Sequence, residues 1–162
     1  MAPLHSTAER FAESAKTLGL EIEIHEFEAT TRTAEDAANV IGCSVGQIVK
    51  SLVFLVDGEA VTTLVSGPNR LDEKKLAALC GVGKKKVRRA DADKVREVTG
   101  YSIGGVPPFA HATKLRTFID EDFWHYDIVW AAGGTANAVF AIAPNELVRV
   151  TEGQAATLKC DN

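Results

Sequence analysis

The chain has 162 residues, of which 46% are hydrophobic and 25% charged, and its formal net charge is −4. This composition is ordinary for a soluble globular protein, and the length favours a single domain over residues 1–162. No apolar run approaches the roughly 18 residues that a membrane span needs, and the N-terminus lacks the layout of a secretory signal. We therefore expect a cytoplasmic protein that does not contact a membrane.

The cysteines argue against a metal site. Cys43, Cys80 and Cys160 are widely separated, and no CxxC pair or Cys/His cluster is present. Zinc sites need closely spaced thiol and imidazole ligands. We expect reduced thiols and neither a metal nor another cofactor.

The first half of the chain predicts helices and strands in mixed order. Ser6 or Thr7 can cap a helix that stops at Gly19. The alternation over residues 21–25 is typical of a half-buried strand. A short helix over 33–41 precedes a Ser44–Gln47 capping box. The largely apolar run 48–56, the Asp57–Gly58 turn signal and the strand 60–65 then predict a hairpin.

The second half adds two short helices and three strands. Asp72 and Asp91 can each cap a helix, over 72–80 and 91–98, that ends at a glycine. Residues 114–119, 126–131 and 138–143 are strand candidates, and a last helix begins at Pro144. Because regular βαβ alternation is missing, we expect an α+β fold: a mixed, largely antiparallel sheet or partial barrel surrounded by helices.

The segment 70–96 is strongly basic. It holds ten Lys and Arg residues against four Asp and Glu residues, so it is +6 while the rest of the chain is −10. Such a segment can bind a polyanion locally. A solvated helix and turn surface explains the same charges equally well. Arg70, in the turn-like stretch 66–70, could reach a phosphate.

A glycine- and proline-rich loop over residues 100–111 is the most informative stretch. Gly104 and Gly105 permit a positive φ and close backbone approach, whereas Pro107 and Pro108 stiffen the chain. A stiff loop with exposed amides suits an anion or a developing oxyanion. A purely structural turn is the alternative. His111 follows closely enough to contribute to a site.

Two further features could line a site. Lys50 lies near the start of the apolar run 48–56, where it could anchor a carbonyl, a ribose hydroxyl or a phosphate. A lysine at the solvent end of a strand is the simpler alternative, since buried lysines are rare. A second glycine turn spans residues 131–137, and either a hairpin or a pocket wall would explain it.

Three segments together resemble the YbaK/ProX family, the free-standing editing domains related to the insertion domain of bacterial prolyl-tRNA synthetases. They are Gln47–Val53, Thr99–Pro108 and the stretch from Gly133 to Val148. Their order and spacing also fit the family, so the resemblance covers about residues 5–150. It implies an α+β domain and an enzyme that hydrolyses the ester of mischarged aminoacyl-tRNA, chiefly tRNA for proline.

The resemblance also implies roles for individual residues. Lys50 matches the family lysine, and Gly104 to Pro108 match its GxxxP loop. Lys50 would hold the carbonyl or terminal ribose, while amides near Gly104 and Gly105 would stabilise the oxyanion of attacking water. The residues expected to contact the substrate are Phe27, Pro108, His111, Ala132, Gly133, Gly134 and Val139. Those expected to contact tRNA are Arg70, Lys84, Lys85, Lys86, Arg88 and Arg89.

The predicted pocket differs from that of the cysteine-specific deacylases in the family. Those carry a tyrosine where this chain has Phe27 and, with the glycine turns aligned, a serine near Ala132 and an aspartate near Val139. A less polar pocket favours alanine or 2-aminobutyrate over cysteine, with overlap because one methylene is worth only about 1–3 kcal/mol. Prolyl-tRNA synthetase is a possible partner. The alternatives are a module that binds charged tRNA or a synthetase without hydrolysis, and a general esterase.

Overall fold

The computed structural model describes residues 4–28 and 33–161, and it shows an α+β domain built on two sheets. Strands β4 (Val87–Arg89), β2 (Val49–Val56), β3 (Glu59–Ser66), β5 (Arg116–Asp120) and β8 (Gln154–Ala156) form the larger sheet in that order. Strands β1 (His25–Glu26), β7 (Ala138–Ile142) and β6 (Val129–Ala132) form the smaller one. Along the part of the chain described, no helix is both long and apolar enough to cross a membrane.

The larger sheet is mixed. β2 pairs antiparallel with β3 and with β4, whereas β3 pairs parallel with β5 and β5 pairs parallel with β8. The β2–β3 hairpin turns at Asp57 and Gly58, both with positive φ, as the sequence predicts. Lys50 lies opposite Val65 in this hairpin.

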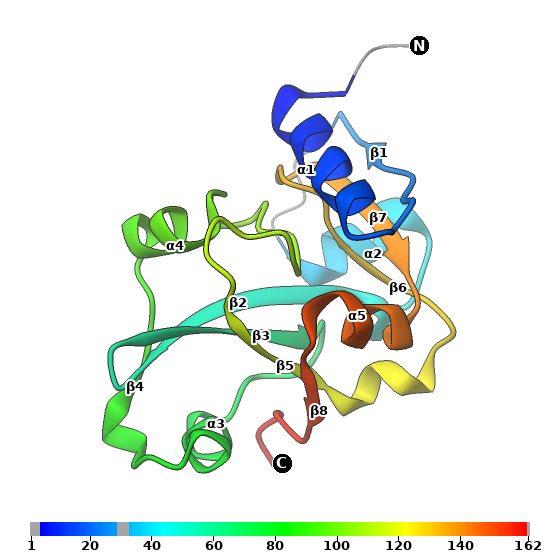
Figure 1. The fold of residues 1–162 in the computed structure, drawn as a ribbon. Coiled ribbons are helices and arrows are strands. Elements are labelled where there is room, and N and C mark those ends of the chain that lie inside the picture. The colour runs from blue at the N-terminus through cyan, green and yellow to red at the C-terminus, as the bar shows by residue number, and fades with distance from the viewer. Residues whose placement is uncertain (1–3, 29–32, 162) are drawn as a thin grey trace.

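The smaller sheet stands above one end of the larger one and carries α1 (Ser6–Thr17) on its outer side (Figure 1). Phe11 of α1 packs against Phe140 of β7, with ring centroids 5.2 Å apart. A parallel bridge between Ile48 and Trp130 joins the two sheets. The edge of β2 therefore diverges from β6 beyond this bridge.

Local sequence signals explain most helix ends. In α2 (Ala34–Ile41), Thr33 and Asp36 form a reciprocal capping box. Asp72 caps α3 (Glu73–Cys80) and Asp91 caps α4 (Ala92–Thr99). Left-handed glycines end all three helices, and α5 (Pro144–Thr151) begins with its proline. For α1, the predicted Ser6 or Thr7 cap is wrong, because the His5 side chain accepts from the Thr7 N–H at 3.1 Å.

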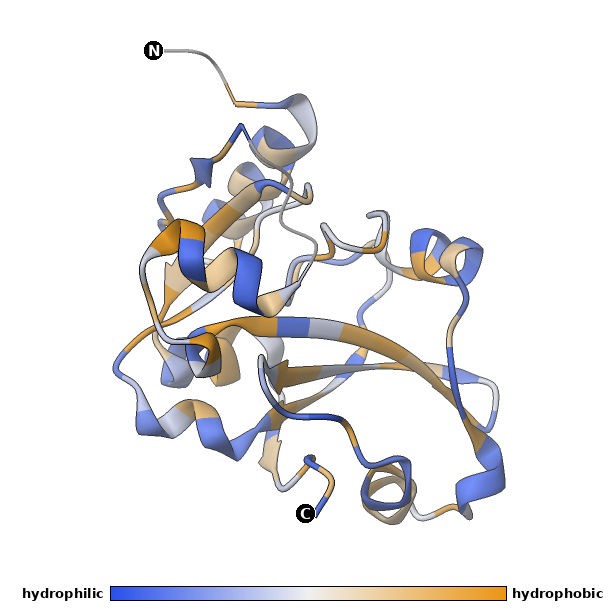
Figure 2. Cartoon of the chain, turned by 180° about the vertical axis from the view of Figure 1, so that it is seen from behind, coloured by the Kyte–Doolittle hydropathy of each residue, from blue (hydrophilic) through white to orange (hydrophobic). Residues whose placement is uncertain are grey.

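The hydrophobic core lies on both faces of the larger sheet. Figure 2 shows apolar colour along β2 and β3 and polar colour on the outward faces of the helices. One cluster packs β2 against the loop 100–111 and the smaller sheet, and includes Phe11, Leu64 and Phe140. A second packs β2 and β3 against α3, and includes Phe54, Leu76 and Phe118. A third, smaller cluster joins α2 to Ile48.

The C-terminal tail is fastened to the turn that follows β3. Asp72 donates its N–H to the Leu158 carbonyl at 2.8 Å, and Cys160 donates to the Arg70 carbonyl at 2.8 Å. The Leu158 side chain is fully buried. Neither β8 nor this tail is predicted from the sequence.

One predicted strand is mostly wrong. Residues 21–24 of the expected strand 21–25 do not pair, and β1 begins only at His25. Ile22 and Ile24 still pack against the core. The alternation in sequence therefore reflects an extended segment that buries every second side chain but does not pair with another strand. The expected α+β class and largely antiparallel pairing are confirmed, although in two sheets instead of one.

Candidate functional site

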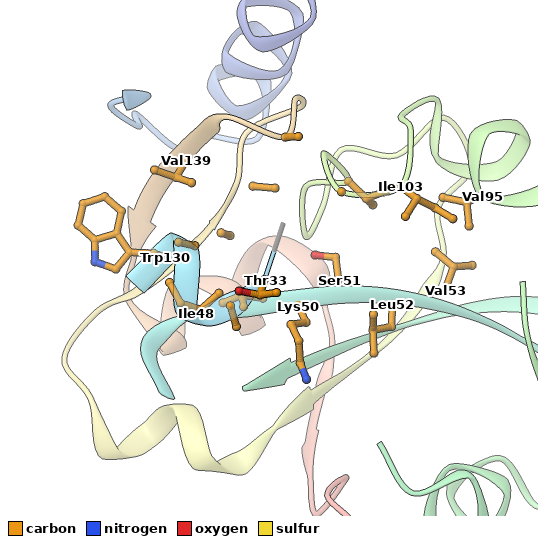
Figure 3. A pocket seen from close by; sticks show the side chains of 18 of the residues that line it. Thr33, Ile48, Lys50, Ser51, Leu52, Val53, Val95, Ile103, Trp130 and Val139 are labelled. Atoms are coloured by element: carbon orange, nitrogen blue, oxygen red, sulfur yellow. The ribbon is translucent and has the colours of Figure 1, made fainter. Parts of the chain in front are cut away.

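A cavity of about 340 Å³ opens between β2, α2, β6, β7 and the loop 100–111. Figure 3 shows these elements around it, with β2 as its floor. Most of its lining is apolar, with small residues such as Ala37, Val53, Ala132, Ala138 and Val139 beside the larger Ile103 and Trp130. The polar side chains in the lining are those of Thr33, Lys50, Ser51 and Arg89. The cavity therefore suits a small apolar group that carries a polar attachment.

Lys50 lies on β2 and points to the opposite side of the strand from Ser51 (Figure 3). Its Nζ donates to the Asn69 carbonyl at 2.5 Å. Burial lowers the pKa of the Lys50 ammonium, and the nearby Asp120 carboxylate partly opposes that shift. The structure thus holds a partly desolvated cation at the border of the cavity.

A buried polar network supports the turn that holds Lys50. The Asp120 carboxylate, fully buried, accepts from the Ser66 N–H at 3.0 Å and from Asn69 Nδ2 at 2.9 Å. The same Asn69 amide donates to Asp122 at 2.8 Å. The hydrogen bonds from Asn69 and Lys159 lower the pKa of Asp122. Because all these groups are paired, the Asn69 carbonyl has a fixed position under Lys50.

Arg89 is the second cation of the cavity lining. It pairs with Phe54 across β2 and β4, which places both on the sheet face that carries Lys50. Its guanidinium carbon lies 5.9 Å from the Phe54 ring centroid, and its charge contributes to lowering the pKa of Lys50. Both cations therefore lie on the face of β2 opposite to Ser51, although both residues contribute to the cavity lining.

Ser51 is a site residue that the sequence analysis missed. Its Oγ is buried, points into the cavity (Figure 3), and has no hydrogen-bond partner among the described residues. The signal lies in the strand pattern: Val49, Ser51 and Val53 share the inward face of β2, so a hydroxyl interrupts an apolar row.

The glycine-proline loop forms the wall opposite β2, and its two glycines differ. Gly104 has φ +94° and lines the cavity. A Cβ on Gly105 would lie 2.7 Å from Thr135 Cα, so only glycine allows the two glycine loops to touch. The Gly105 N–H already donates to the Ser102 carbonyl at 3.0 Å. Gly104 is therefore the better placed of the two amides to face a substrate.

The second glycine turn shapes the cavity indirectly. Gly133 donates its N–H to the Ala138 carbonyl at 2.8 Å, and Gly134, with φ +107°, lies close to the Thr7 backbone. Neither glycine belongs to the lining, whereas the neighbouring Ala132 and Val139 do. The turn positions these two side chains at the ends of β6 and β7.

Phe27 lies outside the cavity lining. Its N–H donates to the Asn137 carbonyl at 2.8 Å, and Asn137 Nδ2 donates to the Phe27 carbonyl at 2.6 Å. These bonds extend the pairing of β1 with β7. Phe27 therefore borders the second glycine turn without facing Lys50 or Ser51.

Pro108 and His111 face a different cavity, of about 240 Å³, shared with Leu18 and Val150. The His111 Nε2 hydrogen-bonds with the Pro107 carbonyl at 2.7 Å. Burial lowers the pKa of this imidazole, and the bond to Pro107 partly opposes the shift. The structure does not bring these two residues together with Lys50.

The predicted tRNA-binding residues are exposed. Lys84–Lys86 form a 3-10 helix between α3 and β4, and Arg88 and Arg89 follow on β4. Arg70 lies apart, in the turn after β3. Arg89 alone of these residues lines the cavity, within the part of the chain that the structure describes. In residues 4–28 and 33–161, no three His, Cys, Asp or Glu side chains gather in a way that would hold a metal ion.

Comparison with known proteins identifies the family. The model of the aminoacyl-tRNA editing domain matches residues 28–150. The uncharacterized protein YwhH of Bacillus subtilis (strain 168) is 35% identical over 128 residues, which cover 78% of this chain and 80% of YwhH. EbsC of Enterococcus faecalis, a candidate Cys-tRNA(Pro)/Cys-tRNA(Cys) deacylase, is 29% identical over 127 residues, which cover 78% of this chain and 76% of EbsC.

A solved structure shares this fold along almost the whole length of the chain. It is described as a candidate trans-editing enzyme for prolyl tRNA synthetase, is 46% identical, and superposes with a TM-score of 0.93 over 98% of this chain and 100% of that chain. The fold class and the YbaK/ProX resemblance predicted from the sequence are both confirmed. The chain therefore belongs to the family of aminoacyl-tRNA editing domains, whose members are hydrolases of aminoacyl-tRNA esters.

Proposed function

We propose that the protein acts in trans on tRNA for proline that carries a small aliphatic amino acid, such as alanine or 2-aminobutyrate. The observation that carries this proposal is a small-residue, apolar cavity bordered by the cations Lys50 and Arg89. An apolar cavity suits the acyl side chain. The two cations beside it suit the ribose and phosphate of the terminal nucleotide.

The proposed reaction is ester hydrolysis. Water adds to the acyl carbonyl, the carbon–oxygen bond to the ribose breaks, and a proton from that water passes to the ribose oxygen. The Gly104 amide stabilises the developing oxyanion. Lys50 exchanges its bond to the Asn69 carbonyl for one to the substrate carbonyl or ribose. Because the ester is already activated, no protein nucleophile is required.

The choice of amino acid rests on Ala132 and Val139. Both line the cavity where cysteine-specific members of the family carry polar side chains. Two apolar side chains disfavour a thiol that needs a polar partner, which supports alanine and 2-aminobutyrate over cysteine. Phe27, the third difference, lies outside the cavity lining and contributes through the glycine turn that it borders.

The proposed RNA contacts are with the unpaired 3′ end and acceptor-stem phosphates. Arg89 belongs both to the cavity lining and to the exposed basic segment 84–89, so it joins the two surfaces. Binding through this segment weakens steeply with salt. Prolyl-tRNA synthetase is the proposed partner and the cytoplasm the proposed location, since mischarged tRNA arises there.

A panel of charged tRNAs tests this function. Alanyl-, 2-aminobutyryl-, cysteinyl- and prolyl-tRNA for proline are incubated with the purified protein, and the loss of aminoacyl ester is followed over time. We expect alanyl- and 2-aminobutyryl-tRNA to be deacylated fastest and prolyl-tRNA to persist. Retained tRNA binding with no deacylation would replace this function with that of a binding module. Equal activity on small esters without tRNA would indicate a general esterase.

A further inference from the structure

Ser51 offers a hydrogen bond that the protein itself does not use. Its Oγ is one of two buried side-chain polar atoms that lack a partner within the described residues, the other being Thr62 Oγ1. An unpaired buried hydroxyl costs about 1–3 kcal/mol. Thr62 lies on β3 outside the cavity lining, whereas Ser51 points into the cavity (Figure 3). The Ser51 hydroxyl therefore faces the cavity with its hydrogen-bonding capacity unused.

The main chain of Ser51 also faces the cavity. The Val53 carbonyl accepts from the Ala90 N–H at 3.0 Å, so it points toward the β4 edge of β2. Residues two apart in a strand direct their backbone groups to the same edge. Within the described residues, the last backbone partner on this edge is Ala90 toward the C-terminal end of β2 and Trp130 toward its N-terminal end. Between these two positions, no strand pairing in the described part of the chain occupies the Ser51 N–H and carbonyl on this edge.

We infer that Ser51 binds the α-ammonium group of the aminoacyl ester, a role that rests on the proposed function. An ammonium is a pure hydrogen-bond donor and needs acceptors. The Ser51 hydroxyl oxygen and carbonyl are two acceptors at one position of the cavity floor. Around them the lining is apolar, which strengthens a charge-assisted hydrogen bond. Ser51 therefore selects acyl groups with a free α-amino nitrogen.

The test compares alanyl-tRNA with N-acetylalanyl-tRNA for the wild-type protein and for Ser51→Ala. Acetylation removes the charge and two of the donors. For the wild-type protein we expect kcat/KM to be roughly 10- to 100-fold lower on the acetylated substrate. Ser51→Ala should lose a similar factor on alanyl-tRNA and little on N-acetylalanyl-tRNA. A merely structural role would lower both equally.

Two further variants control for folding. Ser51→Thr retains the hydroxyl and should recover most of the discrimination. Thr62→Val removes the other unpaired hydroxyl, away from the cavity, and should leave both substrates unaffected. Ser51→Ala should unfold at the wild-type temperature or slightly above it, since it removes an unpaired polar atom.

The outcomes separate this inference from the function beneath it. Wild-type protein that deacylates no aminoacyl-tRNA would overturn the proposed function and this inference with it. Wild-type deacylation with equal rates on both substrates, or a Ser51→Ala variant that keeps full discrimination, would overturn the role of Ser51 alone.

Discussion

The cavity has two walls that are built differently. The strand wall, Val49–Val53 of β2, is held by an eight-residue ladder with β3; it presents the Ser51 side chain to the cavity and carries the Lys50 side chain on the opposite side of the strand. The loop wall consists of residues 103–106 against the second glycine turn, and it presents backbone at Gly104. Contact between glycine backbones, without a hydrogen-bonded ladder, holds the two loops together.

This difference determines what a substitution does. A side chain on the strand wall can be shortened while the ladder stays intact, so activity changes and stability does not. On the loop wall an added side chain separates the backbones, so activity and stability change together. Substitutions on each wall, and in the groups that support them, test that distinction.

Lys50→Ala should reduce kcat/KM on alanyl-tRNA by about 100- to 1000-fold, because it removes the cation proposed to hold the reacting ester. The unfolding temperature should change little, since the hairpin retains its pairing. Deacylation rates and thermal unfolding measure the two effects. Lys16→Ala, on the exposed surface of α1, is the control. Unchanged turnover in Lys50→Ala would remove Lys50 from the mechanism.

Gly105→Ala should lower both stability and activity. Its Cβ would lie 2.7 Å from Thr135 Cα and 2.9 Å from the Gly134 carbonyl oxygen, and neither backbone atom can move freely. We expect a loss of about 1–3 kcal/mol in the free energy of unfolding. Gly83→Ala is the matched control, because nothing lies within 4 Å of that position. Denaturant unfolding that leaves Gly105→Ala as stable as the control would contradict this close contact.

Asp120→Asn should shift the pH profile of deacylation. The Asp120 charge raises the pKa of Lys50 against the larger effect of burial, so removing it lowers that pKa further. If the protonated amine is required, activity will then be lost at a lower pH on the alkaline side. The profile is measured as kcat/KM after subtracting spontaneous ester hydrolysis. Asp122→Asn, which loses a contact to the same Asn69 amide, should leave the alkaline limb in place.

His111 should make stability pH-dependent by a small amount. Burial lowers its pKa in the folded state below the ordinary 6.5. As the pH falls below 6.5, the unfolded chain binds the proton first, so the free energy of unfolding falls, by at most about 1.4 kcal/mol per pH unit. His111→Gln should remove this dependence in unfolding measurements between pH 7.5 and about 5, and the exposed His125→Gln should not. Because His111 does not line the cavity with Lys50, the substitution should change activity only as far as it changes the fraction of folded protein.

Features encoded by neighbouring residues were predictable. The capping boxes at Thr33 and Ser44, the glycine stops and the Asp57–Gly58 hairpin follow from contacts within a few positions. The family followed from three ordered motifs. By contrast, β8 has only three residues and pairs parallel with a distant strand, and such pairing leaves no local pattern.

The site was predictable in outline only. Lys50, Gly104, Ala132 and Val139 line one cavity as expected. Pro108 and His111 belong to the same stiff loop but face the other cavity, as do Phe109 and Ala110 between them. Closeness in sequence did not imply a shared cavity, because backbone direction changes within a few residues. The catalytic roles stay predictions.

The hydrogen-bonded C-terminal tail shows that the folded domain extends beyond the segment that matches the family. The family match ends at residue 150, yet Leu158 is fully buried, and Lys159 pairs with Asp122 at 2.9 Å. Asp122 contacts Asn69, and Asn69 contacts Lys50. A fragment cut at the family boundary would expose apolar surface and release the turn beneath the lysine. Grafting this domain into another protein therefore requires the residues up to 160.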